Sequence, residues 1–277
     1  HRMQRGKRFL RGMHLRRAHR SGKSDKRWPP KRVYPNRRGR KLRRILPALR
    51  YLPPACFAGI AAAAAQNATV PVALHLDHGD SLDLVKECLD AGYTSVMFDG
   101  SRLPFDENAA LTAEAVRLAR DYGASCEGEL GTVGGKEDLL EAQAGAYTDP
   151  DQAAAFVRTS GVDSLAVAVG TAHGVYRTVP KLDLARIPLI QAKADLPLVL
   201  HGASGLQDAV VREAVAKGMA KVNFATELRQ AFTGAVRKAL AEDPQAFDPK
   251  KYLDQGRRSV QKLVEQKIQV CGAVGQA

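Results

Sequence analysis

The chain has 277 residues, 45% of them hydrophobic, which suits one large α/β domain with a sizeable core. Its formal net charge is +13, but residues 1–50 hold 20 Lys and Arg against one acid, so the remaining residues carry −6. A uniformly basic, nucleic-acid-binding domain is therefore excluded, and no run of roughly 18 apolar residues is present that would span a bilayer.

The basic segment, residues 1–54, comes first and has little apolar periodicity, so it cannot build a core. Three interpretations are open: a tail that binds RNA or anionic lipid, a solvated disordered extension, or a segment translated in the wrong reading frame. The segment shows no interleaved pattern of aromatic side chains for stacking on bases, so we expect only weak, nonspecific nucleic-acid binding. Residues 55–277 are expected to form the folded domain.

Apolar runs typical of buried parallel strands recur from residue 70 onward, and amphipathic helical stretches separate them. The expected strands are 70–76, 94–98, 125–130, 164–169, 196–200 and 220–224. The expected helices are 56–66, 82–92, 107–123, 149–161, 183–194, 208–218, 226–242 and about 249–269, several of which end at glycine (Gly92, Gly123, Gly161 and Gly218). No GxGxxG follows an early strand, so the alternation predicts six βα units of a TIM (β/α)8 barrel whose first two units are not recognisable.

Three histidines follow strands of this pattern and are flanked by glycine: His78, His173 and His201. A single buried histidine is more often a hydrogen-bonded core residue. Barrels place their chemistry at the carboxyl ends of the strands, however, so these three should meet. Three imidazoles leave the fourth position of Zn²⁺ open, as in catalytic zinc sites. The remaining histidine of the domain, His75, is expected to point into packing or to support the site.

Carboxylates occur beside these histidines. Asp77 precedes His78 and is a candidate for proton transfer, provided that the backbone turns so that both side chains reach the barrel mouth. Glu127 and Glu129 share one face of a strand, where burial is costly unless they bind a cation or donors. Glu137 lies in a glycine-rich stretch that we expect to be a mobile loop, and it is either an acid/base group or a solvated carboxylate.

Glycine, serine and threonine follow the last strands, where barrels often bind phosphate. Candidate residues are Gly170, Gly174, Gly202, Ser204, Gly205, Asn223 and Thr226. Ordinary N-capping by Ser204 and Thr226 is the alternative explanation. A Schiff base is not favoured, because Lys221 begins a strand and Lys193 lies on a helix.

The four cysteines are scattered and form no CxxC motif, which favours a reducing compartment over a disulfide framework. We therefore expect a cytoplasmic protein that is not bound to a membrane.

In their order and spacing, five segments resemble class II (zinc-dependent) ketose-bisphosphate aldolases: 75–79 (HLDHG), 127–137, 170–176 (GTAHGVY), 200–205 (LHGASG) and 221–227 (KVNFATE). Residues 163–176, 196–205 and the VCG at 270–272 look particularly like the tagatose-1,6-bisphosphate branch. The likeness covers residues from about 55 to 277. It implies cleavage of tagatose 1,6-bisphosphate to dihydroxyacetone phosphate and glyceraldehyde 3-phosphate. Fructose-1,6-bisphosphate aldolases share the same motifs, so that substrate stays an alternative.

The resemblance also implies roles. His78, His173 and His201 would bind the catalytic Zn²⁺, and Asp99 with Glu129 would belong to a second metal position. Asp77 would exchange the C4 hydroxyl proton and Glu137 the proton on the carbon beside the carbonyl. The residues Gly174, Gly202, Ser204, Asn223 and Thr226 would hold dihydroxyacetone phosphate, with a monovalent cation nearby. A dimer or tetramer is expected, with an accessory subunit as a further partner.

One part departs from the family, whose members carry two further βα units before HLDHG. Residues 1–54 match neither unit, although their number is close to what the family has. We therefore favour the interpretation that residues 1 to about 54 are out of frame, and reading the DNA in the other two frames tests it. An inactive or non-catalytic aldolase-like subunit is the remote alternative.

Overall fold

The computed structural model describes residues 52–137, 140–142, 147–176 and 179–276, with the side chains of 135–137 and 140–142 left out. Six parallel strands form one sheet in the order β1-β2-β3-β6-β8-β9. Their bounds are β1 His75–Gly79, β2 Ser95–Phe98, β3 Ser125–Leu130, β6 Ser164–Val167, β8 Leu198–Leu200 and β9 Met219–Val222. Because β1 and β9 do not pair with each other, the sheet is an open half-barrel.

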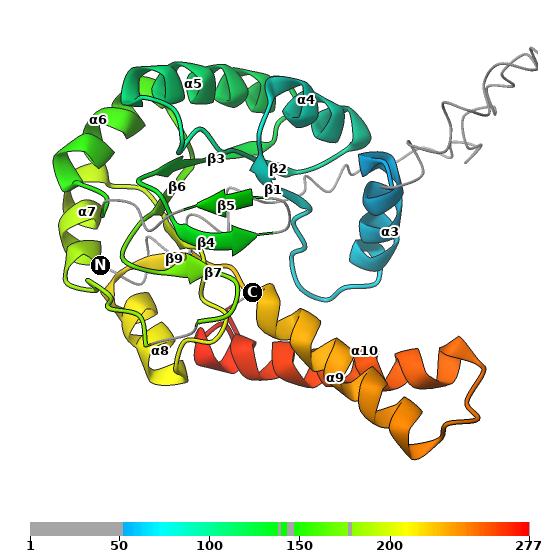
Figure 1. Cartoon of the computed structure of the whole chain (residues 1–277). Coiled ribbons are helices and arrows are strands. Elements are labelled where there is room, and N and C mark those ends of the chain that lie inside the picture. The colour runs from blue at the N-terminus through cyan, green and yellow to red at the C-terminus, as the bar shows by residue number, and fades with distance from the viewer. Residues whose placement is uncertain (1–51, 138–139, 143–146, 177–178, 277) are drawn as a thin grey trace, which may run out of the picture.

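Helices connect successive strands and lie in an arc outside them (Figure 1). They are α4 Leu82–Ala91, α5 Phe105–Asp121, α6 Pro150–Ser160, α7 Arg186–Ala194 and α8 Asp208–Lys217. Glycine ends three of them as predicted, since Gly92, Gly161 and Gly218 are the C-caps of α4, α6 and α8. After α5 the C-cap is Tyr122, and Gly123 follows with φ of +69°. The prediction of six βα units of a barrel is confirmed.

Successive side chains of a strand point to opposite faces of the sheet, so the apolar side chains form two separate clusters, one outside the strands and one inside. Side chains that point outward pack against the helices and form the main core; among them are Val96, Phe98, Leu165, Val167, Leu198 and Leu200. Inward-pointing Met97, Ala166 and Val199 form a separate apolar cluster inside the half-barrel. Glu127 pairs in register with Met97, and Glu129 with Ala166, so both carboxylates share this inner face.

The first strand lies further along the chain than expected. We predicted 70–76, but β1 is His75–Gly79. The reason is that β2 begins at Ser95, which pairs with His75, so residues 70–74 have no strand beside them. As a consequence, His78 lies within a strand and does not follow one.

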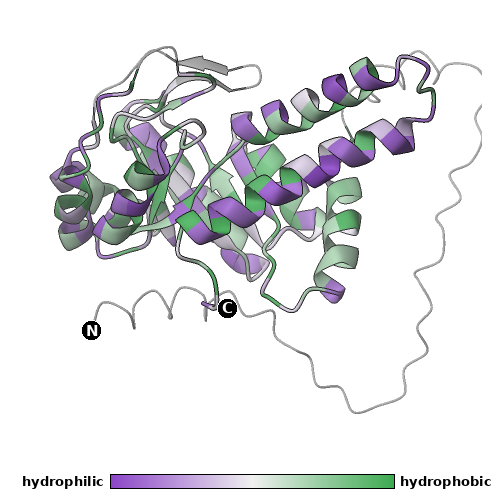
Figure 2. Cartoon of the chain, turned by 90° about the horizontal axis from the view of Figure 1, so that it is seen from below, coloured by the Kyte–Doolittle hydropathy of each residue, from purple (hydrophilic) through white to green (hydrophobic). Residues whose placement is uncertain are grey.

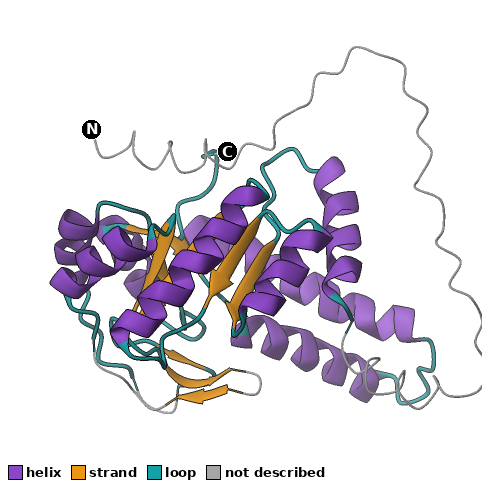
Figure 3. Ribbon diagram, turned by 90° about the horizontal axis from the view of Figure 1, so that it is seen from above, coloured by secondary structure: helices purple, strands orange, loops and turns teal. Residues whose placement is uncertain are grey.

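A second small sheet replaces the expected mobile loop. Strands β4 Gly134–Glu137 and β5 Leu140–Ala142 pair antiparallel, and β4 also pairs with β7 Ala172–His173. Gly134 and Gly135 are the residues opposite β7, and their lack of side chains allows the close approach of the two strands. This sheet lies over one end of the half-barrel (Figure 3).

The remaining helices lie at the ends of the described chain. Helix α3 Pro54–Gln66 contacts α4 and has no buried residue. Helices α9 Thr226–Glu242 and α10 Pro249–Val270 form a long pair that projects away from the strands, with polar and apolar residues interspersed along both (Figures 1 and 2). Among the residues described, no helix combines the length and the hydropathy that crossing a membrane requires.

The basic segment lies almost wholly outside the described residues, because the description begins at residue 52. The interpretation that residues 1 to about 54 are out of frame, and the division of the chain at that point, therefore stay predictions.

Candidate metal centre

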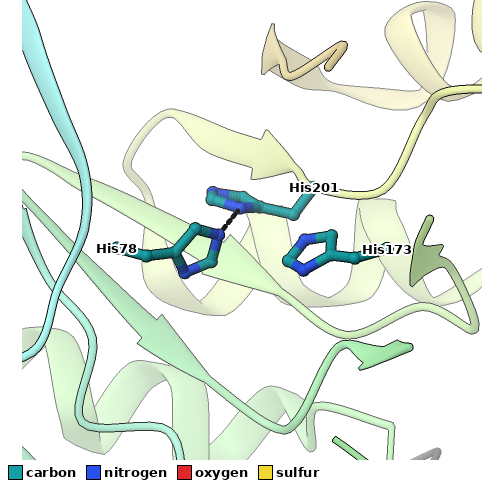
Figure 4. A group of neighbouring side chains, drawn as sticks. All are labelled: His78, His173 and His201. Carbon is teal, nitrogen blue, oxygen red and sulfur yellow. Dashed lines mark hydrogen bonds between the residues drawn. The ribbon is translucent and has the colours of Figure 1, made fainter. Parts of the chain in front are cut away.

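Three histidines from separate strand ends meet inside the half-barrel (Figure 4). The ring centroids of His78 and His201 are 4.6 Å apart, and that of His173 lies 5.0 Å from His78 and 5.9 Å from His201. One nitrogen from each ring lies within 4.8 Å of the others, as a shared metal ion requires. The structure therefore brings together the three histidines that the sequence singled out.

A β-bulge allows Asp77 and His78 to face the site together. The pairing of β1 with β2 shifts register between Leu76 and Gly79, and His78 has φ of +50°. Such a conformation costs a non-glycine residue about 1–2 kcal/mol. With this shift Asp77 lines the cavity beside the histidines, where its carboxylate accepts a hydrogen bond of 3.0 Å from the Asn223 side chain.

The outer nitrogens of two rings are bound by carboxylates, which fixes their tautomers. His78 Nδ1 lies 2.7 Å from Asp99 Oδ2, and His201 Nε2 lies 2.9 Å from Glu127 Oε1. If each of these nitrogens donates, the lone pairs of His78 Nε2 and His201 Nδ1 face each other across 2.9 Å. Two lone pairs at this distance repel unless a cation or proton lies between them, so the donor set fits a metal ion.

Glu127 is buried with 1% of its surface exposed, yet it is held ionised. Burial opposes ionisation, but the hydrogen bond from His201 and the charge of Lys221 lower the pKa of Glu127 to about 2. Lys221 Nζ donates to Glu127 Oε2 at 2.8 Å and lies 3.2 Å from His75 Nε2. Burial, and then the charge of Lys221, lowers the pKa of His75 to about 4, so His75 is neutral and accepts from Lys221. Burying the Glu127 carboxylate on this inner face is costly in free energy, and the hydrogen bonds from His201 and Lys221 offset that cost.

A second group of possible ligands shares His78 with Asp99 and Glu129, whose ligand atoms also lie within 4.8 Å of one another. Glu129 Oε2 is buried without a hydrogen-bond partner. Burial, and then the charge of Asp99, raises the pKa of Glu129 to about 8. Asp99 itself stays ionised, because hydrogen bonds from His78 and Ser101 outweigh burial and lower its pKa to about 2.

The residues expected to hold a phosphorylated substrate lie around one cavity of about 580 Å³, which is also lined by Asp77, His173 and His201. They are Gly174, Gly202, Ser204, Asn223 and Thr226. N-capping does not explain Ser204 or Thr226: the N-cap of α8 is Gln207, and that of α9 is Ala225. Instead, Ser204 Oγ accepts a hydrogen bond of 2.9 Å from Ala225 N, which joins the loops after β8 and β9.

Tyr176 joins the two loops that carry His173 and His201, and the sequence reasoning missed it. Its hydroxyl accepts a hydrogen bond from Ala172 N and donates one to Gly202 O, both at 2.8 Å. The only available signal was its place three residues after His173.

We expected Lys221 to begin a strand, and this position is wrong. It is the third residue of β9, and its side chain reaches the metal centre from inside the half-barrel.

Glu137 ends β4, two residues beyond Gly135, which pairs with His173. Its side chain is outside the described part of the structure, so its expected role stays a prediction.

Comparisons with known proteins show the family and the fold. The family profile described as "Fructose-bisphosphate aldolase class-II" matches residues 47–276, beginning a few residues before position 55. The chain is 46% identical over 209 residues to a D-tagatose-1,6-bisphosphate aldolase subunit, GatY, of Klebsiella oxytoca, covering 75% of this chain and 74% of that one.

Two solved structures share the fold. The YdjI aldolase of Escherichia coli K12 superposes with a TM-score of 0.71 at 39% identity, covering 80% of this chain and 78% of that chain. A fructose-bisphosphate aldolase of Campylobacter jejuni superposes with a TM-score of 0.70 at 22% identity, covering 81% and 77%, and this likeness shows the fold alone.

Proposed function

The chain belongs to the class II fructose-bisphosphate aldolase family, so it is an aldehyde-lyase, and from this premise we propose that its substrate is tagatose 1,6-bisphosphate. The products would be dihydroxyacetone phosphate and glyceraldehyde 3-phosphate. The 46% identity to the tagatose-bisphosphate aldolase subunit of K. oxytoca supports this substrate. Fructose 1,6-bisphosphate is the second candidate, because it is the substrate in the family's own description.

The convergence of His78, His173 and His201 is the observation that carries the proposal of metal-dependent cleavage, and it is common to both candidate substrates. Zinc is the ion that this set suits best, since three neutral imidazoles leave one position open for substrate. When bound, Zn²⁺ would polarise the ketose carbonyl and stabilise the negative charge that develops as the C3–C4 bond breaks. Glu127 and Asp99 hold His201 and His78 in the tautomers that present lone pairs to the ion.

Asp77 is proposed to accept the C4 hydroxyl proton in cleavage and to return it in condensation. Its carboxylate lines the cavity next to His173 and His201, and the Asn223 amide donates to one of its oxygens. That hydrogen bond directs the carboxylate and leaves the other oxygen for the substrate hydroxyl. Glu137 is proposed to exchange the proton on the carbon beside the carbonyl.

The phosphate of dihydroxyacetone phosphate is proposed to bind between the loops after β7, β8 and β9. Gly174 and Gly202 have φ of +94° and +67°, which expose backbone N–H groups, and Ser204 and Thr226 supply hydroxyls. Thr226 begins α9, whose N-terminus favours an anion. A monovalent cation beside the phosphate and a second divalent ion on Asp99 and Glu129 complete the proposed ligand set.

The proposed partners follow from the relatives, and the proposed location follows from the cysteines. We propose a homodimer or homotetramer, with an accessory subunit, since the K. oxytoca relative is itself described as a subunit. A cytoplasmic location is proposed because all four cysteines are free thiols.

The test is cleavage of tagatose and fructose 1,6-bisphosphates by the purified chain, with triose phosphate release followed with and without a chelator. We expect chelator-sensitive cleavage that zinc restores, and a faster rate with tagatose bisphosphate. A faster rate with the fructose isomer would overturn the choice of substrate. A zinc-loaded chain that cleaves neither would overturn the proposal in favour of a non-catalytic subunit.

A further inference from the structure

We propose that Lys221 is a positioning residue of the metal centre, which sets the orientation of His201, and with it the affinity for the metal, through Glu127. This inference rests on the proposed function in one respect, namely that His201 is a metal ligand.

Both oxygens of the Glu127 carboxylate are engaged, and by different partners. Oε1 lies 2.9 Å from His201 Nε2, and Oε2 accepts a hydrogen bond of 2.8 Å from Lys221 Nζ. A carboxylate held at one oxygen only can turn about its terminal torsion, which is broad for glutamate. With both oxygens held, the plane of the carboxylate is fixed, and the imidazole ring that bonds to it is fixed as well.

Lys221 is itself held from a second side. His75 Nε2 lies 3.2 Å from Lys221 Nζ, while His75 Nδ1 lies 2.8 Å from Ser95 Oγ, and Ser125 Oγ donates to Ser95 Oγ at 2.9 Å. The ammonium therefore sits between Glu127 on β3 and His75 on β1, although Lys221 belongs to β9. This chain of contacts ties four strands of the half-barrel, β1, β2, β3 and β9, to one candidate metal ligand.

The positive charge of Lys221 stabilises Glu127 because that carboxylate is buried. Glu127 and His201 are each only 1% exposed, and a buried carboxylate without compensating donors is costly. Removing the ammonium would leave Glu127 Oε2 as a buried acceptor without this donor, and the carboxylate would move to find another. His201 would then lose its fixed hydrogen bond, and its Nδ1 would point less accurately at the site shared with His78 and His173. Partners that orient metal-binding histidines change metal affinity by about 10- to 100-fold when they are mutated.

The experiment compares Lys221→Met with the wild-type full-length chain. Zinc affinity is measured without substrate, by competition with a chromophoric chelator, and Co²⁺ is substituted so that its visible absorption bands report the ligand geometry. We expect zinc affinity to fall about 10- to 100-fold and the Co²⁺ bands to shift. The matched control is Lys193→Met, because Lys193 on α7 forms an exposed ion pair of 2.6 Å with Asp151 on α6, and we expect no change in zinc affinity there.

Two further variants keep the proposal open to refutation. Lys221→Gln keeps a hydrogen-bond donor without the charge, and it replaces Lys221→Met if that protein does not fold; we expect about a tenfold loss of zinc affinity. Glu127→Gln should weaken zinc binding too, and Lys221→Met combined with Glu127→Gln should bind zinc no worse than the weaker single variant, because both act along one path.

Several results would overturn the inference. Zinc affinity and Co²⁺ bands that do not change in either Lys221 variant would do so, as would losses that add in the double variant. A rise in KM alone, with zinc affinity intact, would instead make Lys221 a substrate ligand. A wild-type chain that binds no zinc or cleaves no bisphosphate would overturn the proposed function instead, so the two failures are distinguishable.

Discussion

The sharpest structural prediction concerns Gly202, which directly follows His201 in the loop after β8. An added Cβ at this position would lie 2.6 Å from Ala172 O and 2.8 Å from Ala172 C, closer than real Cβ atoms come. The obstacle is backbone, which cannot swing away as a flexible side chain would. Gly202→Ala should therefore push apart the loops that carry His173 and His201.

The magnitude follows from two contributions. Alanine at φ of +67° costs about 1–2 kcal/mol, less about 0.4–1 kcal/mol for the lower entropy of the unfolded chain. The clash adds the cost of overpacking, about 1–3 kcal/mol. We expect a total loss of about 1–4.6 kcal/mol, and zinc affinity at least about tenfold lower because both neighbouring candidate ligands shift.

Gly123→Ala is the matched control. Its φ is +69°, almost the same as that of Gly202, but no atom lies within 4 Å of the added Cβ. It carries the backbone strain without the clash, so we expect a loss of at most about 1.5 kcal/mol and wild-type zinc affinity. Urea unfolding and chelator competition on both variants measure the difference. Equal losses of stability with unchanged zinc affinity in both would refute the reasoning.

Three further predictions concern single side chains. Asp77→Asn removes the proposed proton acceptor, so cleavage should slow by about 10²–10⁴-fold with zinc affinity unchanged; a wild-type rate would exclude this role. Tyr176→Phe deprives two backbone groups of their partner, and urea unfolding should show a loss of about 1–3 kcal/mol; wild-type stability would mean that the loops hold together without the hydroxyl. Asp208 has its pKa lowered, chiefly by the hydrogen bond from Gln266, so its stabilisation is present above the unfolded pKa and is lost as pH falls through the lower folded value. Asp208→Asn should therefore be less stable than wild type at pH 7, and the gap should close below about pH 4; a gap that persists in acid would contradict the assignment.

Sequence reasoning located the site because its signals are local. An apolar run with histidine and glycine after it is typical of the carboxyl end of a parallel strand, and in a barrel all such ends lie on one side. His173 and His201 could therefore be paired with His78 without knowledge of any distance. The same locality allowed the six βα units to be counted, since each has its own apolar periodicity and, in several cases, its own glycine cap.

The register of paired strands, and the contacts between strands distant in the chain, could not be predicted from such local signals. The bulge that turns Asp77 and His78 toward one site depends on β2 beginning opposite His75, which the residues of β1 do not specify. Strands β4 and β5 pair with each other and β4 pairs with β7, which lies far along the chain, whereas the glycines of β4 by themselves indicate only a loop.

The sequence by itself determined the βα order and the family, and it singled out the candidate metal ligands, because these depend on residue type and short-range spacing. Only the tertiary structure decided which carboxylate supports which histidine. Glu127 and Glu129 lie two residues apart on the same face, yet their pKa values move in opposite directions. The hydrogen bond from His201 and the charge of Lys221, 94 residues further on, keep Glu127 ionised, while burial and the charge of Asp99 raise the pKa of Glu129. Charged and hydrogen-bonding partners are set by position in space and not by sequence separation. Because the sheet curves, the Lys221 side chain on β9 reaches across the interior of the half-barrel to Glu127 on β3.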